Sequence, residues 1–181
     1  MSARVDTSRE VEKLKALVRD VPDFPKPGIM FKDITPLLAD GDALRAAVTA
    51  MASPFRSDSV HLVAGIESRG FILGAAVATE LGAGFIPIRK PGKLPSDVTS
   101  VEYALEYGTD RLEVHADCAS PGTRVLVVDD VLATGGTARA ACDLMERLGA
   151  RVIGISFLMT LDFLRGREKL AGRRIESVMA F

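Results

Sequence analysis

Two adjacent carboxylates and a glycine-rich segment stand close together in the second half of the chain. Asp129 and Asp130 follow the apolar run 125–128, and the small residues 133–137 open the next apolar-periodic stretch. Glycine lets the backbone approach an anion closely, threonine hydroxyls donate hydrogen bonds, and the first N–H groups of a helix attract negative charge. This part of the pattern predicts a phosphate-binding loop made of Ala133, Thr134, Gly135, Gly136 and Thr137.

Two negative charges beside a phosphate repel it unless they meet hydroxyl groups, a cation or a developing positive charge. A sugar phosphate satisfies both halves of the pattern, because the loop holds the phosphate while Asp129 and Asp130 accept hydrogen bonds from ribose hydroxyls. Neither the Walker loop nor the dinucleotide pattern Gly-x-Gly-x-x-Gly occurs, so those nucleotide-binding classes lose support. The alternative without a function is a strand-to-helix turn with two solvated acids.

The stretch 124–137 resembles the signature with which type I phosphoribosyltransferases bind phosphoribosyl diphosphate (PRPP). The resemblance implies the type I phosphoribosyltransferase fold, with the 5'-phosphate of PRPP on the loop 133–137 and its ribose on Asp129 and Asp130. It leaves open which acceptor receives the phosphoribosyl group.

The remaining elements predict an α/β fold around a parallel sheet. The run 125–128 is typical of a strand buried on both faces, and such a strand ends in a ligand crevice. Strands are expected at 61–66, 84–88, 152–160 and 175–180, and helices over 8–20, from Asp40 or Asp42 to near Pro54, over 71–81 and along 138–148. We therefore expect a sheet of about five strands flanked by helices.

Composition limits the class of protein. The 181 residues are 48% hydrophobic, which suits one sizeable core, and we predict a single domain over 1–181. The net charge of -1 gives no general electrostatic reason to bind nucleic acid or an anionic membrane. Two cysteines without a metal-type partner, and no apolar signal or spanning segment, predict a cytoplasmic location without membrane attachment.

Cationic residues gather at two further turns. Arg69 follows the strand 61–66 beside a glycine and a helix start, which favours an anion site over a surface salt bridge. In the family this turn resembles the diphosphate loop, so Glu67 and Ser68 are included, and a cis peptide would lie between them. Lys90 and Lys93 are assigned to the diphosphate, although a charge run is more often a solvated face. Arg89 serves either this site or a subunit contact.

The segment 24–38 resembles the base-binding hood of adenine phosphoribosyltransferases, and the hood is expected mainly at 20–38. Three prolines within 21–28 break regular structure, and 29–36 reads as a rigid, irregular segment, so a connecting loop is the alternative. The resemblance implies that adenine is bound by Met30, Phe31, Lys32 and Leu161. Phe31 would stack on the base and Met30 and Lys32 would offer main-chain contacts, whereas Leu161 is equally explained as a core leucine.

Residues 98–115 alternate in polarity and predict a β-hairpin, either an edge hairpin or a lid at about 95–113. Within it, 101–108 resembles the flexible loop of adenine phosphoribosyltransferases. The resemblance implies that Glu106 exchanges a proton at N7 of adenine, and that Tyr103 and Tyr107 close over the diphosphate and ribose. Desolvation raises the pKa of a carboxyl group, which suits it to this task.

Together these features predict a purine-salvage enzyme that converts adenine and PRPP to AMP and diphosphate. The catalytic residues are expected to be Glu106, Arg69, Asp129 and Asp130. Because no carboxylate cage is visible, Mg²⁺ should be carried by the substrate rather than by direct protein ligands. The resemblance also implies a homodimer.

Two alternatives remain open. The first is a 6-oxopurine phosphoribosyltransferase, since stacking on Phe31 does not distinguish purines, although no charged side chain is evident for the O6 position. The second is a non-catalytic, PRPP-sensing regulator that binds nucleic acid. Near-neutral charge, the absence of a helix-turn-helix pattern and the presence of Glu106 count against it.

Overall fold

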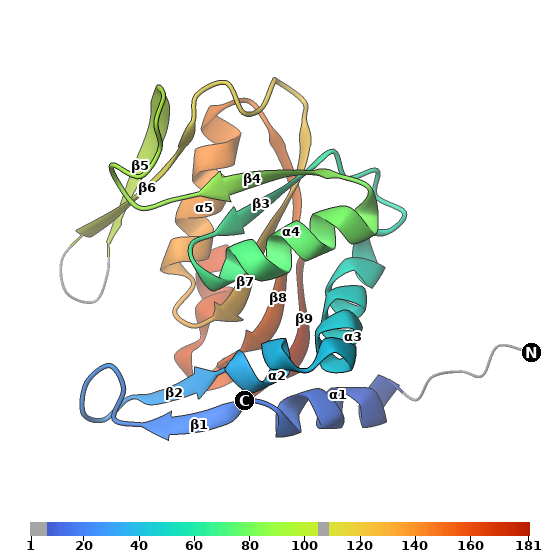
Figure 1. Ribbon diagram of the computed structural model, residues 1–181. Coiled ribbons are helices and arrows are strands. Elements are labelled where there is room, and N and C mark those ends of the chain that lie inside the picture. Colours follow the sequence, from blue (N-terminus) through green and yellow to red (C-terminus); the bar gives the residue numbers. More distant parts are fainter. Residues whose placement is uncertain (1–6, 105–108) are drawn as a thin grey trace, which may run out of the picture. The chain divides into compact units, whose positions relative to one another are not determined.

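A computed structural model describes residues 7–104 and 109–181, and the chain forms two compact units, Met1–Ala50 and Met51–Phe181 (Figure 1). The second unit is built on a five-stranded sheet of order β4-β3-β7-β8-β9, in which every neighbouring pair is parallel. Its strands are β3 (Leu62–Ile66), β4 (Gly84–Ile88), β7 (Arg124–Leu132), β8 (Arg151–Thr160) and β9 (Ile175–Ala180). The predicted parallel sheet of about five strands is confirmed.

Helices cover both faces of this sheet (Figure 1). Helix α5 (Gly136–Arg147) packs its alanines, Cys142, Leu144 and Met145 on one face. Helix α4 (Arg69–Leu81) lies on β3 and β7 and buries Leu73 and Val77. Residues 125–128 of β7 are fully buried, which explains why they form an uninterrupted apolar run. Short 3₁₀ helices occupy Ser53–Phe55, Asp162–Leu164 and Gly166–Leu170.

Strand β7 is longer than its apolar run indicated. It continues to Leu132, so Asp129 and Asp130 belong to the strand instead of following it. Because all five strands are parallel, the turns that follow β3, β4, β7 and β8 lie at one edge of the sheet. Side chains from segments more than sixty residues apart in the sequence therefore lie at the same edge of the sheet.

The predicted hairpin is confirmed as β5 (Val98–Ala104) paired antiparallel with β6 (Thr109–His115). Val101 pairs with Leu112 and Tyr103 with Asp110. Since every second residue of a strand shares a face, these four side chains line one side of the hairpin. Val101 and Leu112 are buried in the same core cluster as α5, so this side faces inward.

The first unit comprises α1 (Thr7–Ala16), β1 (Arg19–Pro22), β2 (Met30–Asp33), α2 (Thr35–Ala39) and α3 (Gly41–Ala52), whose last two residues fall in the second unit. Two expectations are corrected here. The helix expected over 8–20 ends at Ala16, because the chain enters β1 at Arg19. The segment 29–36, expected to be irregular, contains β2 and the start of α2. Among the described residues, no helix is long and apolar enough to cross a membrane.

Candidate active site

A cavity of about 340 Å³ opens at the carboxyl edge of the sheet. It is lined by the end of β3 and the turn after it, by Lys90 shortly after β4, and by the end of β7, the loop that follows it and the first turn of α5. Most of the predicted phosphate, ribose and diphosphate residues line it: Glu67, Ser68, Arg69, Lys90, Asp129, Asp130, Ala133, Thr134, Gly135, Gly136 and Thr137. Three turns that are distant in the sequence therefore form one site.

The loop 133–137 ends in a backbone turn that requires glycine. Gly135 caps α5 with a φ of 80°, a conformation that residues with a side chain adopt only at a cost. A Cβ atom at this position would also overlap the carbonyl oxygen of Gly166. Helix α5 starts immediately afterwards, so its first-turn N–H groups, which lack intrahelical partners, border the cavity. This geometry suits a phosphate group.

The two aspartates differ in their surroundings. Asp130 is 4% exposed, and Arg69 Nε lies 2.9 Å from its Oδ2 atom. Oδ1 of Asp129 accepts a hydrogen bond of 2.9 Å from the backbone N–H of Asp130. Gly70 allows this close packing, since a Cβ atom there would lie 2.8 Å from Asp129 Oδ1. Within the described part of the chain, Asp130 Oδ2 has an ion-pair partner and no hydrogen-bond donor.

Burial raises the pKa of both carboxyl groups. For Asp129, burial and then repulsion by Asp130 raise the pKa well above the usual aspartate value. For Asp130, burial raises the pKa, and the guanidinium of Arg69 opposes it without cancelling it. A buried pair of like charges is costly unless donors or positive charge approach it. The pair is therefore suited to hydroxyl groups and to a developing positive charge.

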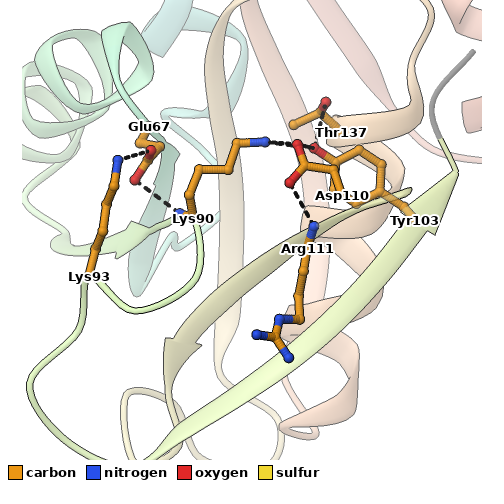
Figure 2. A network of polar contacts seen from close by, with 7 residues as sticks. All are labelled: Glu67, Lys90, Lys93, Tyr103, Asp110, Arg111 and Thr137. Carbon is orange, nitrogen blue, oxygen red and sulfur yellow. Dashed lines mark hydrogen bonds and ion pairs between the residues drawn. The ribbon is translucent and has the colours of Figure 1, made fainter. Parts of the chain in front are cut away.

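The cations after β4 are held by Glu67, at the turn after β3 (Figure 2). Lys93 Nζ lies 2.7 Å from Glu67 Oε1, and the backbone N–H of Lys90 donates to Oε2 at 3.0 Å. Arg89 Nε is 3.5 Å from the same Oε2 atom. Burial raises the pKa of Glu67, but the hydrogen bonds from Lys93 and Lys90 lower it more, so the net pKa is below the usual value. Since its carboxylate meets cations, Glu67 organises them.

Two hairpin residues join this network: Tyr103, which is expected to close over the diphosphate and ribose, and Asp110, for which the sequence predicts no role in the site. Asp110, expected only as part of a turn, forms an ion pair with Lys90 Nζ (Figure 2). The hydroxyl of Tyr103 lies 3.1 Å from Lys90 Nζ and 3.3 Å from Thr137 Oγ1. One signal was available, because the alternation of the hairpin puts Asp110 on the same inward side as Leu112.

The remaining predicted residues lie elsewhere. Leu161 borders a second cavity of about 260 Å³ at the end of β8, together with Thr160 and residues 165–168. In the first unit, Phe31 packs edge-on against Phe24 with ring centroids 5.0 Å apart, Met30 is 47% exposed, and Lys32 pairs with Asp20 at 2.6 Å. Glu106 and Tyr107 lie outside the described residues. The Glu67–Ser68 peptide is cis, as the resemblance suggested.

The donor set at the cavity fits a metal that arrives with its ligand. Among residues 7–104 and 109–181, no group of three or more acidic, histidine or cysteine side chains is placed to hold a metal ion. Mg²⁺ usually keeps several waters and binds through substrate phosphates with one or two carboxylates. Asp129 and Asp130 lie beside the phosphate-type loop, where a metal carried by substrate phosphates would need no direct protein ligand.

Comparisons with known proteins agree with this geometry. The sequence matches the phosphoribosyl transferase domain over residues 37–174. It is 57% identical over 171 residues to an adenine phosphoribosyltransferase of Methylococcus capsulatus, covering 94% of this chain and 100% of the relative. It is 60% identical over 154 residues to the enzyme of that name from Thermobifida fusca, covering 85% and 88% of the two chains.

Solved structures resemble it throughout. The adenine phosphoribosyltransferase of Rhodothermus marinus superposes with a TM-score of 0.93 at 50% identity, over 96% of this chain and 99% of that one. The Giardia lamblia enzyme, solved with 9-deazaadenine, superposes with a TM-score of 0.90 at 41% identity, over 94% and 97%. The parallel sheet, the cavity at its carboxyl edge and these similarities lead to one assignment: the chain belongs to the adenine phosphoribosyltransferases, within the phosphoribosyl transferase domain family.

Proposed function

We propose that this chain is a purine-salvage enzyme that transfers the 5-phosphoribosyl group of PRPP to adenine, giving AMP and diphosphate. One observation carries the proposal: a single cavity joins a phosphate-type helix start, the half-buried Asp129 with the buried Asp130, and a cationic turn. PRPP presents a phosphate, ribose hydroxyls and a diphosphate, and each of these meets a matching group there. The relatives' name and the adenine in the solved complex of the Saccharomyces cerevisiae enzyme, at 35% identity, support the choice of base.

In the proposed binding mode, the loop 133–137 holds the 5'-phosphate through backbone N–H groups and threonine hydroxyls. Asp129 and Asp130 accept hydrogen bonds from the ribose hydroxyls, which provides Asp130 Oδ2 with the donor it lacks among the described residues. Lys90, Lys93, Tyr107 and the turn at Glu67 and Ser68 receive the diphosphate. Mg²⁺ carried by the substrate would supply positive charge that offsets part of the negative charge of the diphosphate.

In the proposed mechanism, the bond from ribose C1 to the diphosphate oxygen breaks as N9 of adenine attacks C1 from the opposite side. Positive charge grows on the ribose beside Asp129 and Asp130, whose carboxylates stabilise it. Arg69, Lys90 and Lys93 take up the negative charge of the departing diphosphate. Much of the acceleration then comes from orientation and preorganised charge.

The base is proposed to stack on Phe31, with main-chain contacts from Met30 and Lys32 and with Leu161 on its other face. Glu106 accepts the proton that adenine loses as N9 gains the ribose, and donates it in the reverse reaction. The hood at 20–38 and the lid at about 95–113 are proposed as parts of one phosphoribosyltransferase domain. We further propose a cytoplasmic homodimer that binds neither nucleic acid nor membrane.

A base panel tests this function against its alternatives. Purified protein is incubated with PRPP, Mg²⁺ and, in separate reactions, adenine, hypoxanthine, guanine or xanthine, and the nucleotides are separated by chromatography. AMP from adenine alone supports the proposal. Turnover of an oxopurine at a comparable rate contradicts the assigned base, and tight PRPP binding without turnover on any base indicates a regulator.

A further inference from the structure

The ammonium group of Lys90 is engaged by the hairpin (Figure 2). It forms an ion pair with Asp110 of β6 and donates a hydrogen bond of 3.1 Å to the hydroxyl of Tyr103 on β5. The Tyr103 hydroxyl donates in turn to Asp110 Oδ2 at 3.2 Å. Lysine, tyrosine and aspartate thus form a closed triangle in which the carboxylate supplies the only full negative charge.

The same tyrosine contacts a second residue that lines the cavity. Thr137 Oγ1, in the first turn of α5, donates to the Tyr103 hydroxyl at 3.3 Å. The hairpin therefore contacts both the proposed phosphate loop, through Thr137, and the proposed diphosphate site, through Lys90. Tyr103 and Asp110 are direct cross-strand partners, so the hairpin register brings them to one point.

Glu67 binds the backbone N–H of Lys90, whereas Asp110 binds its ammonium group. The two carboxylate oxygens of Glu67 meet Lys93 Nζ, Arg89 Nε and the backbone N–H of Lys90. Glu67 thereby fixes the turn that carries Lys90, while Asp110 meets the charge that the lysine presents. The effects on acidity agree: burial raises the pKa of Asp110, but the hydrogen bond from Lys90 and further donors outweigh it and lower the net pKa.

We propose that Asp110 is an internal competitor for the diphosphate: its carboxylate holds Lys90 in the ligand-free protein and releases it when the diphosphate of PRPP binds. Asp110 is thus a positioning residue that sets the affinity for PRPP and links the hairpin to occupancy of the site. The inference rests on the proposed assignment of Lys90 to the diphosphate.

The competition follows from the chemistry of the groups. A lysine ammonium has three donors, and a diphosphate offers more negative charge and more acceptor oxygens than one carboxylate. The ion pair is only partly shielded from water, since the side chains of Lys90 and Asp110 are 34% and 26% exposed. Its loss on ligand binding should therefore weaken affinity modestly, by roughly two- to tenfold.

The test measures binding of PRPP and of diphosphate, each with Mg²⁺, by isothermal titration calorimetry. Four proteins are compared: the wild type, Asp110→Asn, Lys90→Gln and the double variant. Asp110→Asn should tighten both ligands by roughly two- to tenfold. Lys90→Gln should weaken both, and adding Asp110→Asn to it should change nothing further, because the competitor then has no lysine to hold.

Glu102→Gln is the matched control. Glu102 lies on the same hairpin, is exposed and belongs to the opposite side from Tyr103, so its replacement removes an equal charge without touching Lys90. Its dissociation constants should match the wild type. An equal tightening in Glu102→Gln overturns the proposal, because the effect would then be one of net charge.

Two further results overturn it and separate it from the proposed function. Weaker binding by Asp110→Asn means that the carboxylate supports Lys90 in the complex and does not compete. Unchanged diphosphate affinity in Lys90→Gln means that Lys90 does not bind the diphosphate, so the site assignment fails first. Because a gain in affinity is expected, a variant that is merely misfolded cannot imitate the predicted outcome.

Discussion

At the scale of single residues, the site concentrates negative charge where most proteins avoid it. Asp129 and Asp130 are neighbours in β7, and burial raises the pKa of each. Arg69 Nε lies 2.9 Å from Asp130 Oδ2, so the guanidinium offsets part of the negative charge of this carboxylate. We expect such an arrangement to lower the stability of the free protein at neutral pH, and in the proposed binding mode it serves ribose hydroxyls and a developing positive charge.

We expect Asp129→Asn to make the free protein more stable at pH 7 and less active. The folded-state pKa of Asp129 is raised above its usual value of 3.8. The folded form therefore binds its proton more tightly, and stability is lost as pH rises from the unfolded pKa through the folded one. In urea unfolding from pH 4 to pH 8, the free energy of unfolding of the variant should rise relative to that of the wild type as the pH increases. Turnover should fall about 10- to 100-fold through the lost charged acceptor.

No gain in relative stability toward neutral pH would contradict the charged, mutually repelling pair. The difference between the two proteins is the quantity to compare, because the lowered pKa values of Glu67, Asp110 and Glu146 act in the opposite direction in both.

Glu106→Ala should lower turnover more than PRPP affinity, because a proton-transfer group acts on the base and not on the diphosphate. General acid–base catalysis typically contributes about 10²- to 10⁴-fold, so a loss in this range is expected. Initial rates at saturating adenine and direct PRPP titration measure the two effects separately. Unchanged turnover would remove Glu106 from the mechanism.

At the scale of elements, the site depends on how β7 passes into α5. The turn needs a left-handed glycine at 135, and it is backed by the carbonyl of Gly166. This unit was predictable because its signals are local: an apolar run, two acids, small residues and an amphipathic helix. The end of β7 was not predictable from the sequence. Asp129 and Asp130 are polar, so they do not look like part of a buried strand, but pairing with β8 continues the strand through them.

Gly135→Ala should lose both stability and PRPP affinity, and Gly172→Ala serves as its control. Both glycines have a φ near +80°, but a Cβ atom at 172 would meet nothing within 4 Å. Gly172→Ala should therefore cost only the left-handed strain, about 1–2 kcal/mol, and keep its PRPP affinity. Urea unfolding and PRPP titration compare the pair, and equal losses in both would contradict the packing argument at 135.

Contacts between distant elements were the part that sequence patterns did not reveal. Asp110 has its role because β5 pairs with β6 in one register and β4 ends beside them. Glu67 organises cations 22 to 26 residues further along the chain, at Arg89, Lys90 and Lys93. Neither partnership leaves a local signature, whereas the hairpin itself followed from its alternation.

At the scale of the whole molecule, a net charge of -1 gives no general attraction for a highly charged anion. In the proposed binding mode, PRPP is therefore bound by the local arrangement at the carboxyl edge of the sheet, and the proposed Mg²⁺ reduces the charge of the ligand.

Mg²⁺ should bind with PRPP and only weakly on its own. Calorimetric titration of MgCl₂ into the protein should give no saturable heat at low millimolar concentrations, whereas PRPP should bind more tightly with Mg²⁺ than with EDTA present. The reason is that protein carboxylates alone bind Mg²⁺ weakly, whereas phosphate oxygens of the substrate and water molecules complete its coordination shell. A micromolar Mg²⁺ site in the free protein would contradict a metal carried by the substrate.

Transfer of a phosphoribosyl group from PRPP to adenine can be followed directly by ³¹P NMR of the reaction. With protein, PRPP and Mg²⁺ present, PRPP should persist until adenine is added. AMP and diphosphate should then appear together in equal amounts. Diphosphate release without a base, or a PRPP spectrum that adenine leaves unchanged, would contradict this transfer.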